Sequence, residues 1–253
     1  MRFHNRCPGC ILAGVVVLAV AGLARAESRF VLAGGDVVVM VGGTNMVHLQ
    51  QAGYLETMLA QAFASSQPRF RDLSWEADTV FSLGTAIERW RKDGFGTWDA
   101  QLKRVGATVV IAQFGRLESR AGPGGLARFI NAYRRLVDGF GKQARLVVLV
   151  TPTPFEKPAS PLIPDLSKRN AVLSLYVKAI AKIAAQRELV FVDLFSAARP
   201  GLTDNGMHVK PAAQAGIARE IARQLGLEVT AGLQQRSLRR AVIEKHRLWY
   251  DYW

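Results

Sequence analysis

Residues 36–45 read DVVVMVGGTN, and this stretch decides the fold. Its apolar part, Val37 to Val41, is not interrupted by any polar residue. A continuous apolar run is typical of a strand buried on both faces of a parallel sheet, because a half-exposed strand alternates apolar and polar residues. The two glycines that follow favour a tight turn. The stretch therefore predicts a central buried strand, with Thr44 just beyond its carboxyl end.

Strands and helices alternate along the rest of the chain. Similar apolar runs occur at 107–114, 145–150 and 189–194, and residues 69–73 form a weaker, alternating strand candidate. Helices are expected at 50–64, 85–104, 125–140 and 168–187, and after Pro211, which suits the first turn of a helix. This order predicts an α/β fold, a three-layer α/β/α sandwich around a mostly parallel five-stranded sheet of the flavodoxin-like kind.

Residues 1–26 have the pattern of a signal peptide. Two arginines near the start precede an apolar core at 11–23 and a small-residue cleavage site at 24–26. We therefore expect export to the periplasm or the extracellular space, with an uncleaved membrane anchor as the alternative. The two cysteines, Cys7 and Cys10, both lie inside this segment. The exported chain would have neither disulfides nor a catalytic thiol.

The rest of the chain is basic and long enough for one domain. The formal net charge is +13, and removing residues 1–26, which hold three arginines and no acid, lowers it to +10. An exported protein of this charge is expected to meet an anionic polymer or a membrane surface, whereas nucleic acid is not expected there. A solvated basic surface is the alternative. We predict one α/β domain over residues 27–230 and a tail over residues 231–253.

The tail combines basic and aromatic side chains. They are Arg236, Arg239, Arg240, Lys245 and Arg247, followed by Trp249, Tyr250, Tyr252 and Trp253. Three interpretations are open: a helix on a membrane surface, a lip that stacks on carbohydrate, or a segment whose rings pack against the sandwich.

Loops rich in polar residues follow each predicted strand. They span residues 42–45, 74–79, 115–119, 151–154 and 202–208. Because the carboxyl ends of parallel strands lie at one edge of a sheet, we expect these loops to gather around one site. The last loop reads LTDNGMH and pairs a histidine with a nearby carboxylate, which is a pattern of general acid–base chemistry.

This arrangement of loops resembles the SGNH (GDSL-type) hydrolases over residues 30–226. In that family a Gly-Asp-Ser loop supplies the nucleophile, and a late Asp-x-x-His loop supplies the base. Here GGT and DNGMH stand in those places. The resemblance implies that Thr44 is the nucleophile, that His208 is the base, and that Asp204 or Asn205 orients the histidine.

The resemblance also implies an oxyanion hole, made in the family by a glycine amide and an asparagine side chain. Ala77 stands at the glycine, and its backbone N–H can still donate. Leu117 stands at the asparagine and donates nothing, and the loss of one such donor costs about 3 to 4 kcal/mol. Glu118, next to it, is interpreted as a polar loop residue, a substitute acid or a group that binds a cation.

Two further residues depart from the family pattern. The β-methyl group of Thr44 restricts its side-chain rotamers and crowds the approach to a carbonyl carbon. Asn205 cannot stabilise an imidazolium as a carboxylate does, and such a change costs about 10⁴ in rate in a serine protease. Asp204, one residue earlier, is the alternative partner of the histidine.

Two main functional hypotheses follow. The first is an exported esterase or deacetylase, with a degenerate active site, that acts on acylated carbohydrate or an envelope polymer. The second is a noncatalytic protein that keeps the cleft to bind a glycan or a peptide. A structural envelope protein anchored by its tail is a third hypothesis. No cofactor is expected, and no metal site is expected, because the histidines do not have a metal-ligand spacing.

Overall fold

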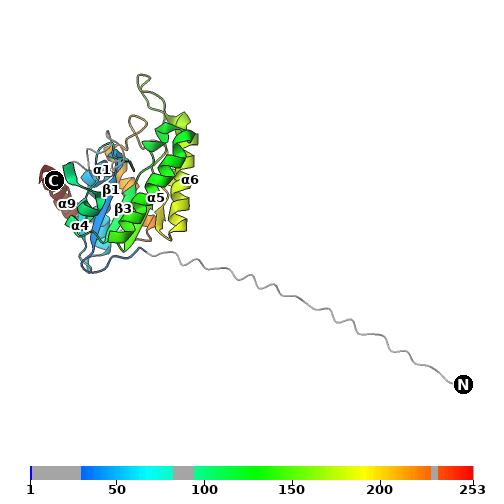
Figure 1. The fold of residues 1–253 in the computed structure, drawn as a ribbon. Helices are drawn as coiled ribbons and strands as arrows, with labels where there is room; N and C mark the ends of the chain where they lie inside the picture. Colours follow the sequence, from blue (N-terminus) through cyan, green and yellow to red (C-terminus); the bar gives the residue numbers. More distant parts are fainter. Residues whose placement is uncertain (2–29, 82–93, 229–232, 253) are drawn as a thin grey trace.

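A parallel sheet forms the centre of the computed structural model, which describes Met1 and residues 30–81, 94–228 and 233–252 (Figure 1). The strands are β1 (Val37–Gly42), β2 (Arg69–Asp72), β3 (Val109–Gln113), β4 (Leu146–Val150) and β5 (Val190–Val192). Their order in the sheet is β2-β1-β3-β4-β5, and every neighbouring pair is parallel. The predicted α/β fold with a five-stranded sheet is confirmed.

Helices cover both faces of this sheet, as Figure 1 shows. One layer holds α4 (Trp98–Val105), α5 (Leu126–Gln143) and α6 (Asn170–Gln186), and the other holds α1 (Thr44–Ala52), α2 (Tyr54–Ala62) and α8 (Pro211–Gln224). Shorter elements are η1 (Glu118–Ala121), η2 (Pro123–Gly125), η3 (Ser167–Arg169) and α7 (Leu194–Ala197).

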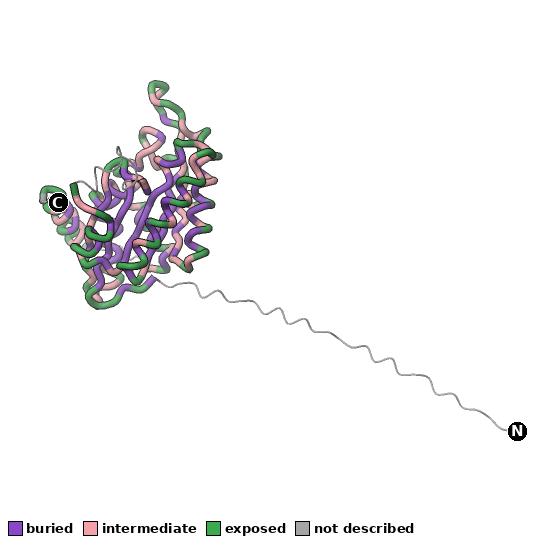
Figure 2. The backbone as a smooth tube through the Cα atoms, in the orientation of Figure 1, coloured by how far each residue is buried: buried purple, intermediate pink, exposed green. Residues whose placement is uncertain are grey.

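β1 lies between β2 and β3 and is buried along its whole length, as Figure 2 illustrates for the sheet. Val37, Val39 and Val41 pack with α4, α5 and α6. Val38 and Met40 pack on the other face with α1, α2 and α8. The apolar run of this strand is therefore continuous because consecutive side chains enter two separate cores.

The helix predicted over residues 50–64 is in fact two helices that meet at Gly53. This glycine has φ 70°, and its N–H donates to the backbone oxygen of Gln50 at 2.9 Å. A Cβ at this position would lie 3.1 Å from Ile243 of the C-terminal helix. Gly53 thus permits both the turn and the close approach of that helix. Part of the helix predicted over residues 85–104 falls on residues 82–93, outside the described residues.

The basic, aromatic tail forms helix α9 (Leu233–Tyr252), which packs against α1 and α2. The indole Nε1 of Trp249 donates to the backbone oxygen of Asp72 at the end of β2 (2.7 Å). Nε of Arg239 donates to the backbone oxygen of Ala52 (2.8 Å). The ring of Trp249 therefore packs against the sandwich, as the third interpretation of the tail expects. In the described parts of the chain, no helix is long and apolar enough to span a membrane.

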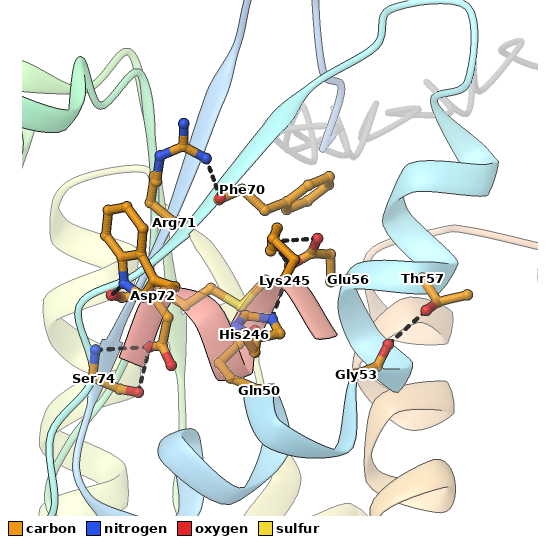
Figure 3. A network of polar contacts seen from close by, with 12 residues as sticks. Gln50, Gly53, Glu56, Thr57, Phe70, Arg71, Asp72, Ser74, Lys245 and His246 are labelled. Carbon is orange, nitrogen blue, oxygen red and sulfur yellow. Dashed lines mark hydrogen bonds and ion pairs between the residues drawn. The ribbon is translucent and has the colours of Figure 1, made fainter. Parts of the chain in front are cut away.

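A buried carboxylate of α2 anchors α9 (Figure 3). Glu56 is only 5% exposed, and both of its carboxylate oxygens accept from Nζ of Lys245 at 2.5 Å. Nε2 of His246 lies 3.0 Å from one of the same oxygens. Burial would raise the pKa of Glu56, but the hydrogen bond with His246 and the charge of Lys245 together lower it. The attachment of α9 is therefore specific, because a carboxylate buried without these partners would be costly.

Candidate functional site

A pocket of about 300 Å³ opens at the carboxyl edge of the sheet. Its walls come from the loops that follow β1, β2, β3 and β4, and from the late loop that carries His208. Thr44, Ala77, Leu117 and Glu118 also line it. The structure thus brings together parts of the chain that lie far apart in sequence, as the parallel topology predicts.

Thr44 and Ala77 face each other at this pocket. Thr44 is the first residue of α1, and its hydroxyl oxygen accepts a hydrogen bond from the backbone N–H of Ala77 at 3.2 Å. Ala77 has φ 56°, a left-handed conformation that favours glycine. Alanine therefore adopts the backbone that a glycine would adopt here, and the amide still points at the hydroxyl.

Asn205 orients the imidazole of His208. Its Oδ1 accepts from the backbone N–H groups of Met207 (3.0 Å) and His208 (2.8 Å). The other end of the amide, Nδ2, therefore faces Nδ1 of His208 at 3.0 Å. Because an amide nitrogen can only donate, Nδ1 of the ring accepts. The neutral ring must then carry its proton on Nε2.

The surroundings of His208 favour this neutral form. Burial lowers the pKa of His208, and electrostatic interactions with His48 and Arg116 lower it further, while that with Glu76 raises it. A neutral imidazole protonated on Nε2 has no lone pair there to take a proton from a hydroxyl group. In this arrangement Nε2 of His208 directs a hydrogen-bond donor at the pocket.

His48 is a second histidine near the pocket, which the sequence interpretation did not include. Its ring lies 5.9 Å from that of His208 in an edge-to-face arrangement, and its Nε2 lies 3.6 Å from a carboxylate oxygen of Glu76. The signal was present in the sequence, because His48 follows Thr44 by four residues and therefore lies one turn later on the same helix. Among the described residues, no group of three or more His, Cys, Asp or Glu is arranged to hold a metal ion.

The remaining residues predicted for the site lie as follows. Asp204 is exposed and is not part of the pocket wall, and among the described residues no hydrogen bond or ion pair joins it to His208. Asn205 is therefore the partner of the histidine. Leu117 is partly buried and gives the pocket an apolar wall at the position that the resemblance to SGNH hydrolases assigns to an amide donor.

Glu118 joins two of the loops that form the pocket. One of its carboxylate oxygens accepts from the backbone N–H of Val80 (2.9 Å), and the other accepts from that of Gly115 (2.8 Å). Burial raises the pKa of Glu118 to about 7, although these backbone hydrogen bonds lower it, and nearby Asp78 raises it further. The side chain holds the β3 loop against the segment after β2, so its contacts are those of a positioning residue.

Glu118 should make stability depend on pH. Its pKa in the folded protein, about 7, lies above its ordinary value of 4.5, so its stabilising contribution is complete below pH 4.5 and is lost as pH rises through 7. The full loss is about 3 kcal/mol. We expect Glu118→Gln to reduce the difference in unfolding free energy between pH 5 and pH 8, measured by urea denaturation. The exposed acid Glu228, changed to Gln, is the control and should leave that difference intact.

Arg116 is a further pocket residue that the sequence interpretation did not assign to the site. Its guanidinium donates to the backbone oxygens of Met207 and Thr153, and its carbon Cζ lies 5.3 Å from the ring centre of Phe155. Burial lowers the pKa of Arg116 to about 10, against the opposing charge of Glu156. The arginine remains charged at neutral pH and ties the loops after β3 and β4 to the loop of His208.

Comparisons of three-dimensional structure place this architecture among known folds. A GDSL-like lipase from Parabacteroides merdae matches with a TM-score of 0.63 and 16% identity over 79% of this chain and 100% of the other. The chain has the SGNH hydrolase fold. A catalytic mutant of the acetylxylan esterase Axe2 from Geobacillus stearothermophilus matches with a TM-score of 0.59 and 16% identity over 79% of this chain and 99% of the other. LAE5, an α/β hydrolase from the metagenome of Lake Arreo, matches with a TM-score of 0.58 and 14% identity, covering 77% and 97% of the two chains.

The SGNH hydrolase fold accounts for the position of the pocket, and it leaves the chemistry to the side chains that line it. No protein-family model matches the sequence, and no curated protein matches it. The activity must therefore be argued from Thr44, Ala77, Leu117, Asn205 and His208 themselves.

Proposed function

We propose that this protein binds an acylated carbohydrate in its pocket and does not hydrolyse it at the rate of an active esterase. The observation that carries the proposal is the hydrogen bond from Nδ2 of Asn205 to Nδ1 of His208. It sets the tautomer of the ring, and the tautomer decides whether Nε2 can accept a proton from a nucleophile.

The alternative protonation states of His208 are unfavourable in this geometry. A proton on Nδ1, in either the other neutral tautomer or the imidazolium, would face the hydrogen atoms of the Asn205 amide. That amide cannot turn over without taking Oδ1 away from two backbone N–H groups. Replacing aspartate by asparagine at the corresponding position of a serine protease costs about 10⁴ in rate. Leu117 removes an oxyanion donor, which costs a further factor of roughly 10² to 10³.

The pocket wall suits a small acyl group next to a polar one. Leu117, Pro152, Phe155 and Met207 provide apolar surface, while Nε2–H of His208 provides a donor for a carbonyl or hydroxyl oxygen. The neighbours from Geobacillus stearothermophilus are named as esterases of acetylxylan and acetyl-xylooligosaccharide. Their fold makes an acetylated xylo-oligosaccharide the first ligand to test, with the sugar chain leaving through the mouth of the pocket.

A second candidate is ester hydrolysis with Thr44 as the nucleophile. The specific observation in its favour is that Thr44, Ala77 and His208 meet at one pocket, with the amide of Ala77 directed at the threonine hydroxyl. For this candidate His208 would have to exchange tautomer when the substrate binds.

One experiment separates the two candidates. Binding of acetylated and chemically deacetylated xylo-oligosaccharides is measured by calorimetry, and acetate release is measured in the same samples. We expect the protein to prefer the acetylated ligand and to release no more acetate than His208→Ala. That variant should bind about tenfold more weakly, because one hydrogen bond is lost, whereas the exposed Asp204→Ala should bind like the wild type. Acetate release that disappears in Thr44→Val would favour the hydrolase, and equal binding of both ligands would contradict the proposal.

We also propose that the protein works outside the cytoplasm, where its basic surface would meet anionic envelope polymers. The support is the signal-peptide pattern of residues 1–26 together with the net charge of +10 that remains without them. Mass spectrometry of the protein expressed in a bacterial host should find a chain that begins at Glu27 outside the cytoplasm. An intact chain that stays in the cytoplasm would contradict export.

A further inference from the structure

Aromatic side chains near the end of α9 lie beside a second cavity. Its volume is about 250 Å³, and it lies between α1, the end of β2 and α9. The wall includes Gln51, His246, Arg247, Trp249, Tyr250 and Asp251. Tyr250 is 63% exposed, so its ring is open to solvent at the rim of the cavity.

Trp75 lies between this surface and the loop of Ala77, which lines the main pocket. Its ring stacks against that of Tyr250, with centroids 6.5 Å apart and planes 25° apart, and the centroid of the Phe95 ring lies 5.2 Å from that of Trp75. Trp75 precedes the pocket residue Ala77 by two positions, and its backbone N–H donates to the oxygen of Gly42 at 3.0 Å. The backbone of Trp75 is therefore tied to the end of β1, and its ring, which stacks on Tyr250, belongs to a residue two positions before the pocket wall.

The base of this aromatic surface is also held in place. The carboxylate of Asp72 accepts from the backbone N–H of Ser74 (2.8 Å) and from its hydroxyl group (2.5 Å), as Figure 3 shows. The backbone oxygen of the same aspartate accepts from the indole of Trp249. Ring surfaces that are already in place lose little conformational entropy when a ligand binds.

The charges around the surface are largely paired. Arg247 donates to Glu244 at 2.8 Å and to Asp251 at 3.0 Å, and Lys245 is bound to Glu56. Binding to an acidic membrane requires unpaired basic residues. At this end of α9 the basic residues Lys245 and Arg247 are paired with acids. Rings with polar groups at their rim suit instead an uncharged ligand that has both apolar faces and hydroxyl groups.

We propose that Tyr250, Trp75 and the adjoining cavity form a second sugar-binding subsite for a neutral oligosaccharide whose acylated residue occupies the main pocket. The inference rests on the proposed function, since it concerns other sugar units of the same ligand. The apolar C–H face of a sugar ring stacks on Tyr250, and its hydroxyl groups bond to Gln51 and Asp251 at the cavity rim.

The test compares a long and a short ligand, acetylated xylohexaose and acetylated xylobiose, by calorimetry on the whole protein. The wild type should bind the long ligand more tightly than the short one. Tyr250→Ala should weaken binding of the long ligand about tenfold and leave binding of the short ligand unchanged. Trp75→Phe, which keeps an aromatic ring, should show a smaller loss. Leu248→Ala, at another exposed position of α9, is the matched control and should bind both ligands like the wild type.

The outcomes distinguish the subsite from the proposed function. If the wild type binds neither ligand, the proposed function fails, and the subsite fails with it. If it binds both with the same affinity, or if Tyr250→Ala weakens both equally, the pocket binds sugar and the subsite is refuted. Tyr250-dependent binding to vesicles of anionic phospholipid, without dependence on ligand length, would also overturn the inference in favour of a membrane surface.

Discussion

Asn205→Asp is expected to raise the pKa of His208 and to give the pocket measurable esterase activity. In the wild type, Oδ1 of Asn205 accepts hydrogen bonds from the backbone N–H groups of Met207 and His208. One oxygen of an aspartate at this position can accept the same two hydrogen bonds. The other oxygen would then accept from Nδ1–H of the ring. This reverses the tautomer and leaves the lone pair of Nε2 free to take a proton from Thr44. The pKa rises because the new carboxylate also stabilises the imidazolium.

The expected gain in activity is large but limited. We expect kcat/KM for p-nitrophenyl acetate to rise on the order of 10² in Asn205→Asp, below the factor of about 10⁴ known for the reverse change, because Leu117 still deprives the oxyanion hole of one donor. Adding Thr44→Ser should increase the rate further by removing the β-methyl group. Nitrogen NMR of the ring would report the tautomer and the pKa directly.

Two control variants test whether the gain depends on His208 and on position 205. Adding His208→Ala to the Asn205→Asp variant should abolish the gain. Asp204→Asn should leave the tautomer and the pKa of His208 unchanged, since in the described part of the chain no hydrogen bond or ion pair joins the exposed Asp204 to the ring. If Asn205→Asp left the ring protonated on the same nitrogen as in the wild type, the orientation of the Asn205 amide, and with it the noncatalytic proposal, would be wrong.

The sequence predicted which loops meet, because that depends on topology alone. An unbroken apolar run such as Val37 to Val41 requires burial on both faces, and the strand order then places Thr44, Ala77 and His208 at one edge. These arguments need no knowledge of side-chain geometry, which explains their success.

The partner of His208 could not be predicted in the same way. Asp204 and Asn205 are adjacent, and which one faces the ring depends on how the backbone turns at Gly206, which has φ 78°. The role of Glu118 was likewise open, since its two acceptors bond to backbone N–H groups whose positions only the folded chain defines. Arg116 was missed because an arginine in a loop is usually solvated, whereas this one is partly buried, with its guanidinium over the ring of Phe155.

Gly206→Ala should disrupt the loop that carries His208. Gly206 is buried, and a Cβ added to it would lie 2.3 Å from the backbone oxygen of Glu156 and 3.3 Å from Cδ of Pro158. Glu156 cannot move away easily, because its backbone N–H donates to the oxygen of Gly206 at 2.8 Å. Its carboxylate also accepts from the backbone N–H groups of Gly201 (2.6 Å) and Thr203 (2.7 Å).

The expected loss of stability is about 2 to 4 kcal/mol, the sum of left-handed backbone strain and overpacking. Gly201→Ala is the matched control: it lies in the same loop with φ 88°, but a Cβ there would meet nothing within 4 Å. It should lose only about 1 kcal/mol, the cost of the backbone strain alone. Urea denaturation of both variants measures the difference, which isolates the clash with Glu156.

Ligand affinity should fall in Gly206→Ala and persist in Gly201→Ala, because only the former displaces Asn205 and His208. Equal stability and equal affinity of the two variants would show that the loop can shift freely. That result would contradict a hydrogen bond that holds Asn205 and His208 in one arrangement.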